Sequence, residues 1–260
     1  MAIMPTVMPI QEHIAVLAAE GARFTALAAR LDAETPVPTC PEWTVRDLIA
    51  HQGEVHRWAT DLIRGRWDGM SPADQADRVA APLGPVLIGW FTDGVHDLID
   101  ALKNAPDNLQ SMVFLLDAPP PRHFWARRQA NETRMHRIDA LSAELGRKPV
   151  AAETDITTAE AIDGIDELLN GFIPRKRTNL RSAEPFTIAI EPNDIDRRWV
   201  LAVSDDPVVT TETDAPADAT FGGSATEVYL GLWNRGTEMT ATGRPGALEQ
   251  WREQVRVSWQ

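Results

Sequence analysis

Apolar residues recur at helical spacing through the first half of the chain. One stripe repeats at alternating steps of four and three residues and predicts an amphipathic helix of about six turns; it consists of Ile10, Ile14, Leu17, Gly21, Phe24, Ala28 and Leu31. Similar stripes predict three more helices, one from Thr44 to near Gly65, one over 85–103 and one over about 123–145. The segment 66–84 is rich in Asp, Pro, Gly and Ala, which is typical of a long loop. Four long amphipathic helices with polar connections favour a four-helix bundle.

The pattern changes after Pro149. A short helix is predicted over 158–172, and runs of β-type residues follow at 186–190, 198–203, 207–211, 219–224 and 239–243. Ser224 and Glu227 have the spacing of a capping box, which predicts a further helix from that point, and a last helix is expected over 245–259. The chain is therefore predicted to have two domains: an all-α four-helix bundle over 1–150 and a small α+β domain over 151–260.

The charge of the chain restricts its partners. The 260 residues have a net charge of −13. Residues 1–150 contain 15 basic and 19 acidic residues, and residues 151–260 contain 10 basic and 19 acidic residues, a net −9. Neither half has the basic surplus that a phosphate backbone or an anionic bilayer attracts. We therefore expect no nucleic acid and no membrane among the partners of this protein.

Three features that the sequence lacks bear on where in the cell the protein is expected. The longest uncharged run, 79–92, has 14 residues and contains prolines, so it is too short to span a bilayer. Residues 1–10 lack the basic start of a secretory signal. The single cysteine, Cys40, cannot form an intramolecular disulfide. These features predict a cytoplasmic protein.

His51, Glu132 and His136 are the strongest candidates for chemistry. Glu132 and His136 are four residues apart and share a helix face, and the apolar stripe around them predicts that this face is inward. His51 lies on the inward stripe of the second predicted helix. Two histidines and one glutamate form a common catalytic zinc set, which leaves a fourth position open. The alternative is that each is an ordinary buried or boundary residue, because a Glu-x3-His pair is common by chance.

Other candidate residues carry weaker signals. His56 lies about 140° around the helix from His51 and cannot face the same metal. His13, His96 and His123 have no partner at an informative spacing and are expected at surface or boundary positions. Cys40, in a turn flanked by prolines, is expected to be structural, so a reactive thiol would have to come from outside the chain. Arg128 is expected to point away from the stripe that contains Glu132.

Three stretches together resemble one protein family. They are Cys40–His51 (CPEWTVRDLIAH), Glu132–Ala140 (ETRMHRIDA) and Gly222–Arg235 (GGSATEVYLGLWNR). Their sequences and order are similar to those of the mycothiol-dependent maleylpyruvate isomerase family. The resemblance implies a DinB-like metal-binding bundle followed by a domain similar to sterol carrier proteins.

The resemblance also implies the chemistry. The metal ligands of the family correspond to His51, Glu132 and His136, with zinc as the expected divalent metal and mycothiol as the thiol co-substrate. The expected activity is isomerisation of, or S-transfer to, a small electrophile such as maleylpyruvate. Mycothiol is an actinobacterial thiol, and the 22 arginines against 3 lysines are compatible with such a source.

Two further residues and two other functions remain open. Asp139 could contact His136 and orient this metal ligand without binding the metal itself, or it could form a surface salt bridge. Arg235 could bind a substrate carboxylate, or it could be an exposed residue at a helix end. The alternatives to an enzyme are a non-catalytic metal-binding protein with a stress or regulatory role, and a carrier of an apolar ligand. The chain is expected to be a monomer or a homodimer.

Overall fold

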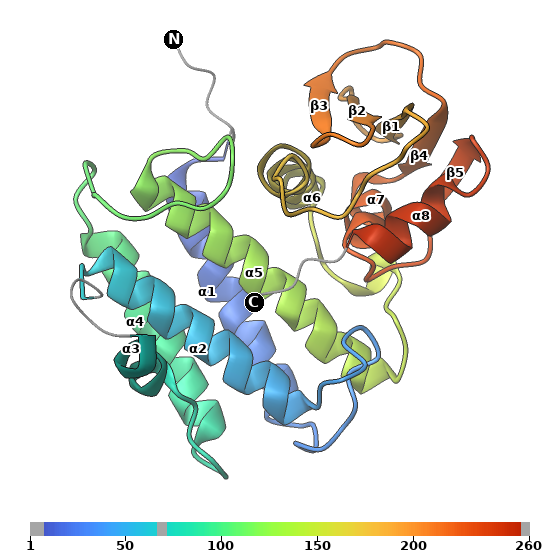
Figure 1. The fold of residues 1–260 in the computed structure, drawn as a ribbon. Coiled ribbons are helices and arrows are strands. Elements are labelled where there is room, and N and C mark those ends of the chain that lie inside the picture. The colour runs from blue at the N-terminus through green and yellow to red at the C-terminus, as the bar shows by residue number, and fades with distance from the viewer. Residues whose placement is uncertain (1–7, 67–71, 256–260) are drawn as a thin grey trace. The chain divides into compact units, whose positions relative to one another are not determined.

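The computed structural model describes residues 8–66 and 72–255, which form two compact units (Figure 1). The helical unit contains the described residues up to Phe114 and the segment Ala118–Arg147. The α+β unit contains Leu115–Asp117 and the described residues from Lys148 onward. The chain thus passes between the units at residue 147, compared with 150 in the sequence prediction.

Four long helices pack together in the helical unit (Figure 1). They are α1 (Ile10–Ala28), α2 (Val45–Ile63), α4 (Leu87–Asn104) and α5 (Pro121–Leu145). The prediction of a loop throughout 66–84 was wrong, because α3 (Pro72–Val79) lies within it. Arg78 at the end of α3 pairs with the buried carboxylate of Asp61 on α2, a long-range contact that local composition does not reveal.

Local side-chain contacts set the ends of the helices that carry the candidate site. The predicted capping box at the start of α2 is confirmed, since Thr44 Oγ1 accepts from the N–H of Asp47 and Asp47 Oδ2 accepts from the N–H of Thr44. Gly146 ends α5 in the left-handed conformation, with φ of 65°, which suits glycine at a C-terminal cap. These signals place His51 and His136 on well-defined helices.

Aromatic and aliphatic side chains fill the interior of the helical unit. Phe24 of α1 and Phe91 of α4 are fully buried, and their ring centroids are 4.8 Å apart. Helices α1 and α4 approach closely at Gly21, where a Cβ atom would lie only 2.6 Å from Val95 Cγ1. The interior packing therefore depends on a small residue in the predicted apolar stripe.

The α+β unit contains a five-stranded sheet in the order β3-β2-β1-β4-β5. The strands are β1 (Phe186–Pro192), β2 (Trp199–Val203), β3 (Val209–Glu212), β4 (Ala219–Gly223) and β5 (Thr240–Gly243). Strands β1 and β4 are parallel, and every other neighbouring pair is antiparallel. All five predicted strands are therefore present, with ends shifted by a few residues.

The helices of the α+β unit follow the sequence prediction with three differences. A short 3-10 helix, η1 (Ala151–Glu153), precedes them. The single helix predicted over 158–172 is α6 (Thr158–Asp166) followed by a π-helical segment, η2 (Glu167–Phe172). The predicted capping box at Ser224 begins α7 (Ala225–Leu232). Helix α8 (Ala247–Gln254) is shorter than predicted, and residues 256–259 of the prediction lie outside the described residues.

Large side chains hold the helices of the α+β unit to its sheet. The Trp251 ring of α8 lies edge-on to Phe221 of β4, and Trp251 Nε1 donates to the carbonyl of Leu232 over 3.0 Å. Leu116 also contacts this unit, since its N–H donates to the carbonyl of Gly171 over 3.3 Å.

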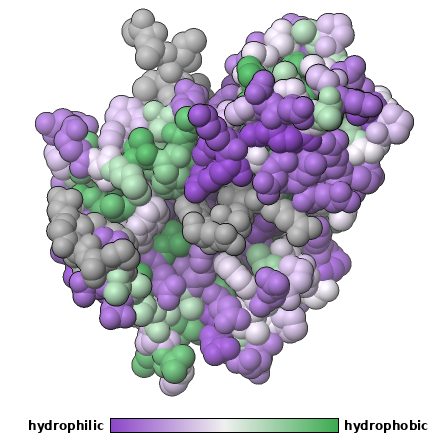
Figure 2. All heavy atoms as spheres, viewed as in Figure 1, coloured by the Kyte–Doolittle hydropathy of each residue, from purple (hydrophilic) through white to green (hydrophobic). Residues whose placement is uncertain are grey.

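The surface of the α+β unit that is visible in Figure 2 is mostly hydrophilic, in keeping with the acidic excess of residues 151–260.

Candidate metal centre

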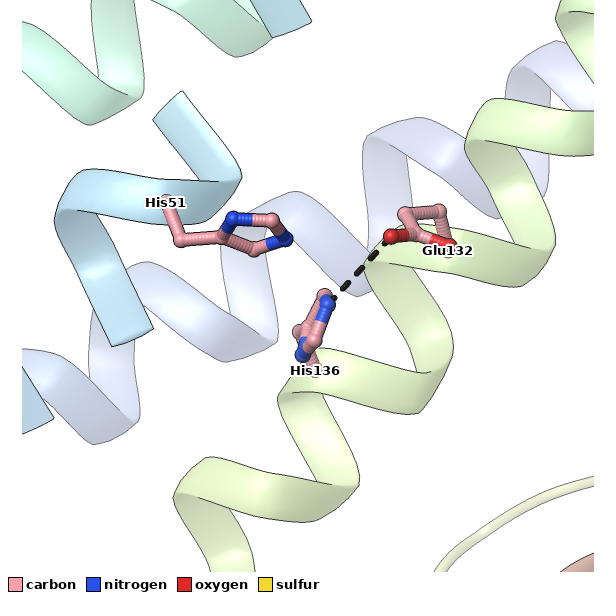
Figure 3. A group of neighbouring side chains, drawn as sticks. All are labelled: His51, Glu132 and His136. Atoms are coloured by element: carbon pink, nitrogen blue, oxygen red, sulfur yellow. Dashed lines mark ion pairs between the residues drawn. The ribbon is translucent and has the colours of Figure 1, made fainter. Parts of the chain in front are cut away.

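Helices α2 and α5 bring the three predicted ligands together. His51, Glu132 and His136, called here the metal-centre group, each offer one donor atom, and these atoms all lie within 4.8 Å of one another. Figure 3 shows the His51 ring on one helix facing the side chains of Glu132 and His136 on the other. The group thus joins His51 to two residues that lie about 80 positions further along the chain.

Spacing along α5 aligns the carboxylate with the second imidazole. Glu132 and His136 are one helical turn apart, and His136 Nε2 lies 3.3 Å from Glu132 Oε1 (Figure 3). Both residues are buried, with 4% and 7% of their surface exposed. The other members of the predicted stripe, Trp125, Gln129 and Ala140, are buried as well, but so is every residue over 124–140, so α5 is enclosed on all sides and not along one stripe.

An indole packs against both histidine rings. The Trp43 ring lies 4.8 Å from the His51 ring and 5.9 Å from the His136 ring, measured between centroids, and is nearly parallel to the latter. The two imidazoles meet edge to face at 5.1 Å. Trp43 therefore restricts the rotation of both imidazoles and covers one side of the group.

Asp139 is hydrogen-bonded to His136. The Nδ1–H of His136 donates to Asp139 Oδ2 over 2.9 Å, and Asp139 is fully buried. A histidine that donates through one ring nitrogen presents the other as a lone pair for a metal. The contact expected between these two residues is present, and it leaves Nε2 directed toward Glu132.

The expectation for Arg128 was wrong. Its side chain is buried, and Nη2 donates to Glu132 Oε2 over 2.6 Å. Arg128 lies one helical turn before Glu132, so the same i, i+4 spacing that pairs Glu132 with His136 also permits this contact. The spacing was a usable signal, but an inward-facing arginine beside an apolar stripe contradicts the usual preference of arginine for the surface.

The electrostatics of the group follow from burial and from these contacts. Burial alone would raise the pKa of Glu132, but Arg128 and His136 outweigh it and hold that pKa well below its usual range. Burial would lower the pKa of His136, but hydrogen bonds to Asp139 and Glu132 raise it to about 9. For His51, burial and the neighbouring His136 lower the pKa to about 4. Without a metal, the group therefore combines the Glu132 carboxylate, a neutral His51 and a protonated His136 at neutral pH.

A divalent metal fits this donor set. His51 Nε2 is buried and has no hydrogen-bond partner among the residues that the structure describes. A buried imidazole nitrogen without a partner is costly, and a metal ion removes that cost. Two imidazoles and a carboxylate are ligands that zinc and similar ions prefer. The residues present therefore suit a three-ligand site with one position open.

Four other residues named in the sequence analysis lie in different surroundings. Arg235 belongs to the α+β unit, where it is half-buried and Nη1 donates to the carbonyl of Trp233 over 3.0 Å; its role stays a prediction. Cys40 lies closer to the site than expected, with Sγ 3.4 Å from Asp139 Oδ2. His13 is 1% exposed, so its assignment to the surface or a boundary was wrong, whereas His96 is exposed as expected.

The fold and site together define a class: a helical unit with a histidine–carboxylate metal centre, joined to a small α+β unit. Residues 17–141 match the family model of the mycothiol maleylpyruvate isomerase N-terminal domain, and residues 159–251 match the C-terminal domain of the same family. This chain belongs to the mycothiol maleylpyruvate isomerase family. The resemblance noted in the sequence is thereby confirmed.

Solved structures show the same fold. The chain is similar to crystal structures of the mycothiol-dependent maleylpyruvate isomerase, one of them a histidine-to-alanine mutant, with TM-scores of 0.60 and 0.63. In both cases the identity is 15%, and the match covers 90% of this chain and 93% of the other. A search of curated proteins finds no significant match. Among helices within 8–66 and 72–255, none is both long and apolar enough to cross a membrane.

Proposed function

We propose that this protein is a metal-dependent enzyme that uses mycothiol on a small electrophile such as maleylpyruvate, either isomerising it or transferring the thiol to it. The observation that carries the proposal is the convergence of His51, Glu132 and His136 in a chain of this family. Zinc is the proposed metal, and the cytoplasm of an actinobacterium is the proposed setting. The helical unit is assigned to the DinB-like bundles and the α+β unit to the sterol-carrier-like domains.

The residues of the chain have distinct tasks in this proposal. His51, Glu132 and His136 hold the ion, which supplies a positive charge that lowers the pKa of a coordinated thiol toward neutrality. Asp139 accepts the Nδ1 proton of His136 and keeps Nε2 directed at the site. Arg128 engages Glu132 Oε2, so that Oε1 remains on the side of His136.

The two reactions differ in the fate of the thiol. In isomerisation the sulfur adds to one carbon of an activated cis double bond, the resulting single bond rotates, and the same carbon–sulfur bond breaks again. The thiol is then returned unchanged. In S-transfer the carbon–sulfur bond remains in the product, and one thiol is consumed for each molecule formed.

Turnover with and without the thiol tests the proposal. The purified protein should contain about one divalent metal per chain and convert maleylpyruvate only when mycothiol is added. Cys40→Ser should retain turnover, because the nucleophilic sulfur comes from the added thiol. Thiol-independent turnover, or activity lost in Cys40→Ser with its metal intact, would contradict the proposal. Full metal without turnover would favour a non-catalytic role, and a co-purified apolar ligand would favour a carrier.

Arg235 is proposed to bind a carboxylate of the thiol or the substrate. Burial lowers the pKa of Lys148, and the nearby charges of Arg252 and Arg235 lower it further, so three cations share one region of a unit with net charge −9. Such a cluster attracts anions. Arg235→Ala should lower kcat/KM by roughly 10- to 150-fold, the range for a lost charged hydrogen bond. Metal content should stay the same, and unchanged kinetics would refute this role.

A further inference from the structure

The loop between α1 and α2 is folded so that its cysteine reaches α5. In residues 36–44, called here the Cys40 loop, the N–H of Val37 donates to the carbonyl of Trp43 over 3.0 Å, which closes the loop. Inside this closure, the N–H of Cys40 donates to the carbonyl of Val37, and the N–H of Trp43 donates to the carbonyl of Cys40. Val37 is fully buried and anchors the loop. Backbone hydrogen bonds therefore fix the direction of the Cys40 side chain.

Two adjacent side chains of this loop contact α5. Thr39 Oγ1 lies 2.8 Å from Ser142 Oγ, and that hydroxyl in turn donates to the backbone carbonyl of Asp139 over 2.7 Å. Cys40 Sγ donates to the side chain of Asp139, at Oδ2, over 3.4 Å. The loop thus holds both the backbone and the carboxylate of Asp139.

The same carboxylate oxygen orients a proposed metal ligand. Asp139 Oδ2 accepts from His136 Nδ1 over 2.9 Å and from the Cys40 thiol, while His136 Nε2 lies 3.3 Å from Glu132 Oε1. We propose that Cys40 is a positioning residue of the metal centre: its thiol fixes the Asp139 carboxylate, which fixes the His136 ring. This inference rests on the proposed function, because it requires the metal-centre group to bind an ion.

A simpler role for Cys40 makes a different prediction. Cys40 also packs beside the apolar core of the helical unit, so it could act as a small hydrophobic residue. In that case alanine would replace it well, and serine would be the worse substitute. A positioning thiol predicts the reverse order, because the serine hydroxyl still donates to Asp139 and alanine does not.

The test compares zinc affinity in four proteins: the wild type, Cys40→Ser, Cys40→Ala and Asp139→Ala. Zinc is titrated against a chromophoric chelator. We expect Cys40→Ser to bind within about 2-fold of the wild type and Cys40→Ala to bind about 3- to 10-fold more weakly, as for one lost neutral hydrogen bond. Asp139→Ala should lose about 10- to 100-fold, as for a direct partner of a ligand.

A double variant isolates the route through Asp139. In the Asp139→Ala background, Cys40→Ala should cause no further loss of zinc affinity, because the link between them is already absent. If this background is too unstable to purify, cobalt spectra replace it: Cys40→Ala should alter the visible bands of bound Co²⁺, and Cys40→Ser should preserve them.

The outcomes separate this inference from the proposed function. Equal zinc affinity and identical cobalt spectra in the wild type, Cys40→Ser and Cys40→Ala would overturn the positioning role and leave the metal centre intact. Further loss in the double variant would also overturn it, since Cys40 would then act by another route. Absence of stoichiometric zinc in the wild type would overturn the proposed function, and this inference with it.

Discussion

Two groups of buried polar side chains lie between helices α2 and α5, and they differ in charge. The metal-centre group contains a carboxylate and is bordered by Arg128 and Asp139. The other, called here the neutral cluster, consists of Gln52, His56 and Thr133. His56 Nε2 lies 2.8 Å from Gln52 Nε2 and 2.9 Å from Thr133 Oγ1. Both groups are buried, so burial alone does not distinguish a site from a structural network.

The difference is clearest between two buried histidines, His56 and His136. Full burial and the nearby charge of Arg57 lower the pKa of His56 to about 3, and its ring contacts two neutral groups, Gln52 and Thr133. His136 is also buried, yet Asp139 and Glu132 raise its pKa to about 9. The adjacent carboxylates therefore distinguish His136 from His56, whereas His51, with a pKa lowered to about 4, resembles His56 in this respect. Substitutions in the metal-centre group and in the neutral cluster should therefore have different effects on metal binding and stability.

Removal of a proposed ligand should have the largest effect. His136→Ala should lower zinc affinity by more than about 100-fold, beyond the range for outer partners, and abolish stoichiometric metal in elemental analysis. The fold should survive, because a chain of this length buries enough surface without a metal. The exposed His96→Ala is the matched control and should keep its metal. Full metal occupancy in His136→Ala would refute the ligand assignment.

Removal of the buried cation should destabilise the metal-free protein. Arg128→Met removes the closer of the two cationic partners of Glu132, so the free energy of unfolding in EDTA should fall by about 3–5 kcal/mol. Zinc should restore part of the loss, because the ion neutralises the same carboxylate. Urea unfolding with and without zinc measures both effects, and Arg128→Lys serves as the control that keeps the charge. A Met variant as stable as the wild type in EDTA would contradict this account.

A substitution in the neutral cluster should lower the stability of the protein and leave its metal binding unchanged. His56→Ala removes the ring nitrogen that contacts both Gln52 and Thr133, so the free energy of unfolding should fall by roughly 1–3 kcal/mol even though these two side chains still contact each other. Zinc content should remain at about one per chain. If His56→Ala lost its metal while still folded, the separation between the two groups would be wrong.

The dependence on pH should be the most diagnostic effect, because it follows from a single group. With a pKa raised to about 9, His136 stabilises the metal-free protein fully below its ordinary pKa of 6.5, and this contribution is lost as pH rises toward 9. Zinc must displace the same proton, so zinc affinity should rise over that window. Unfolding in EDTA and zinc titration at pH 6.5 and 9 measure these opposite trends. His136→Ala should remove the loss of stability, and an unchanged loss would contradict the assignment to His136.

Much of the fold follows from local patterns. The capping boxes at Thr44 and Ser224 begin α2 and α7 as predicted, because a cap needs only residues three positions apart. The four long helices and the strands follow from apolar periodicity for the same reason. The short helix α3 was missed, since its contact with Asp61 joins residues that local composition does not connect.

The candidate site likewise has parts that local sequence patterns predict and parts that they do not. The i, i+4 spacing of Glu132 and His136 is a property of one helix and can be derived from the sequence. Arg128 had that spacing too, but the general preference of arginine for the surface pointed the other way. Trp43 and Cys40 carried no signal of their own, because a loop of nine residues gives no periodicity from which to predict the direction of a side chain.

The sequence by itself determined most of the helices and strands and the pairing of Glu132 with His136, but not the buried face of α2, which contains Gln52, His56 and Ala59 and not the predicted Val55 and Trp58. Only the tertiary structure decided what other elements bring to these residues: His51 of α2 beside Glu132 and His136, and the Cys40 loop against Asp139. The physical reason is the range of the interactions. Helices and i, i+4 pairs depend on neighbours within a turn or two, whereas the charge and orientation of a buried ligand depend on every group that packing brings within hydrogen-bond distance.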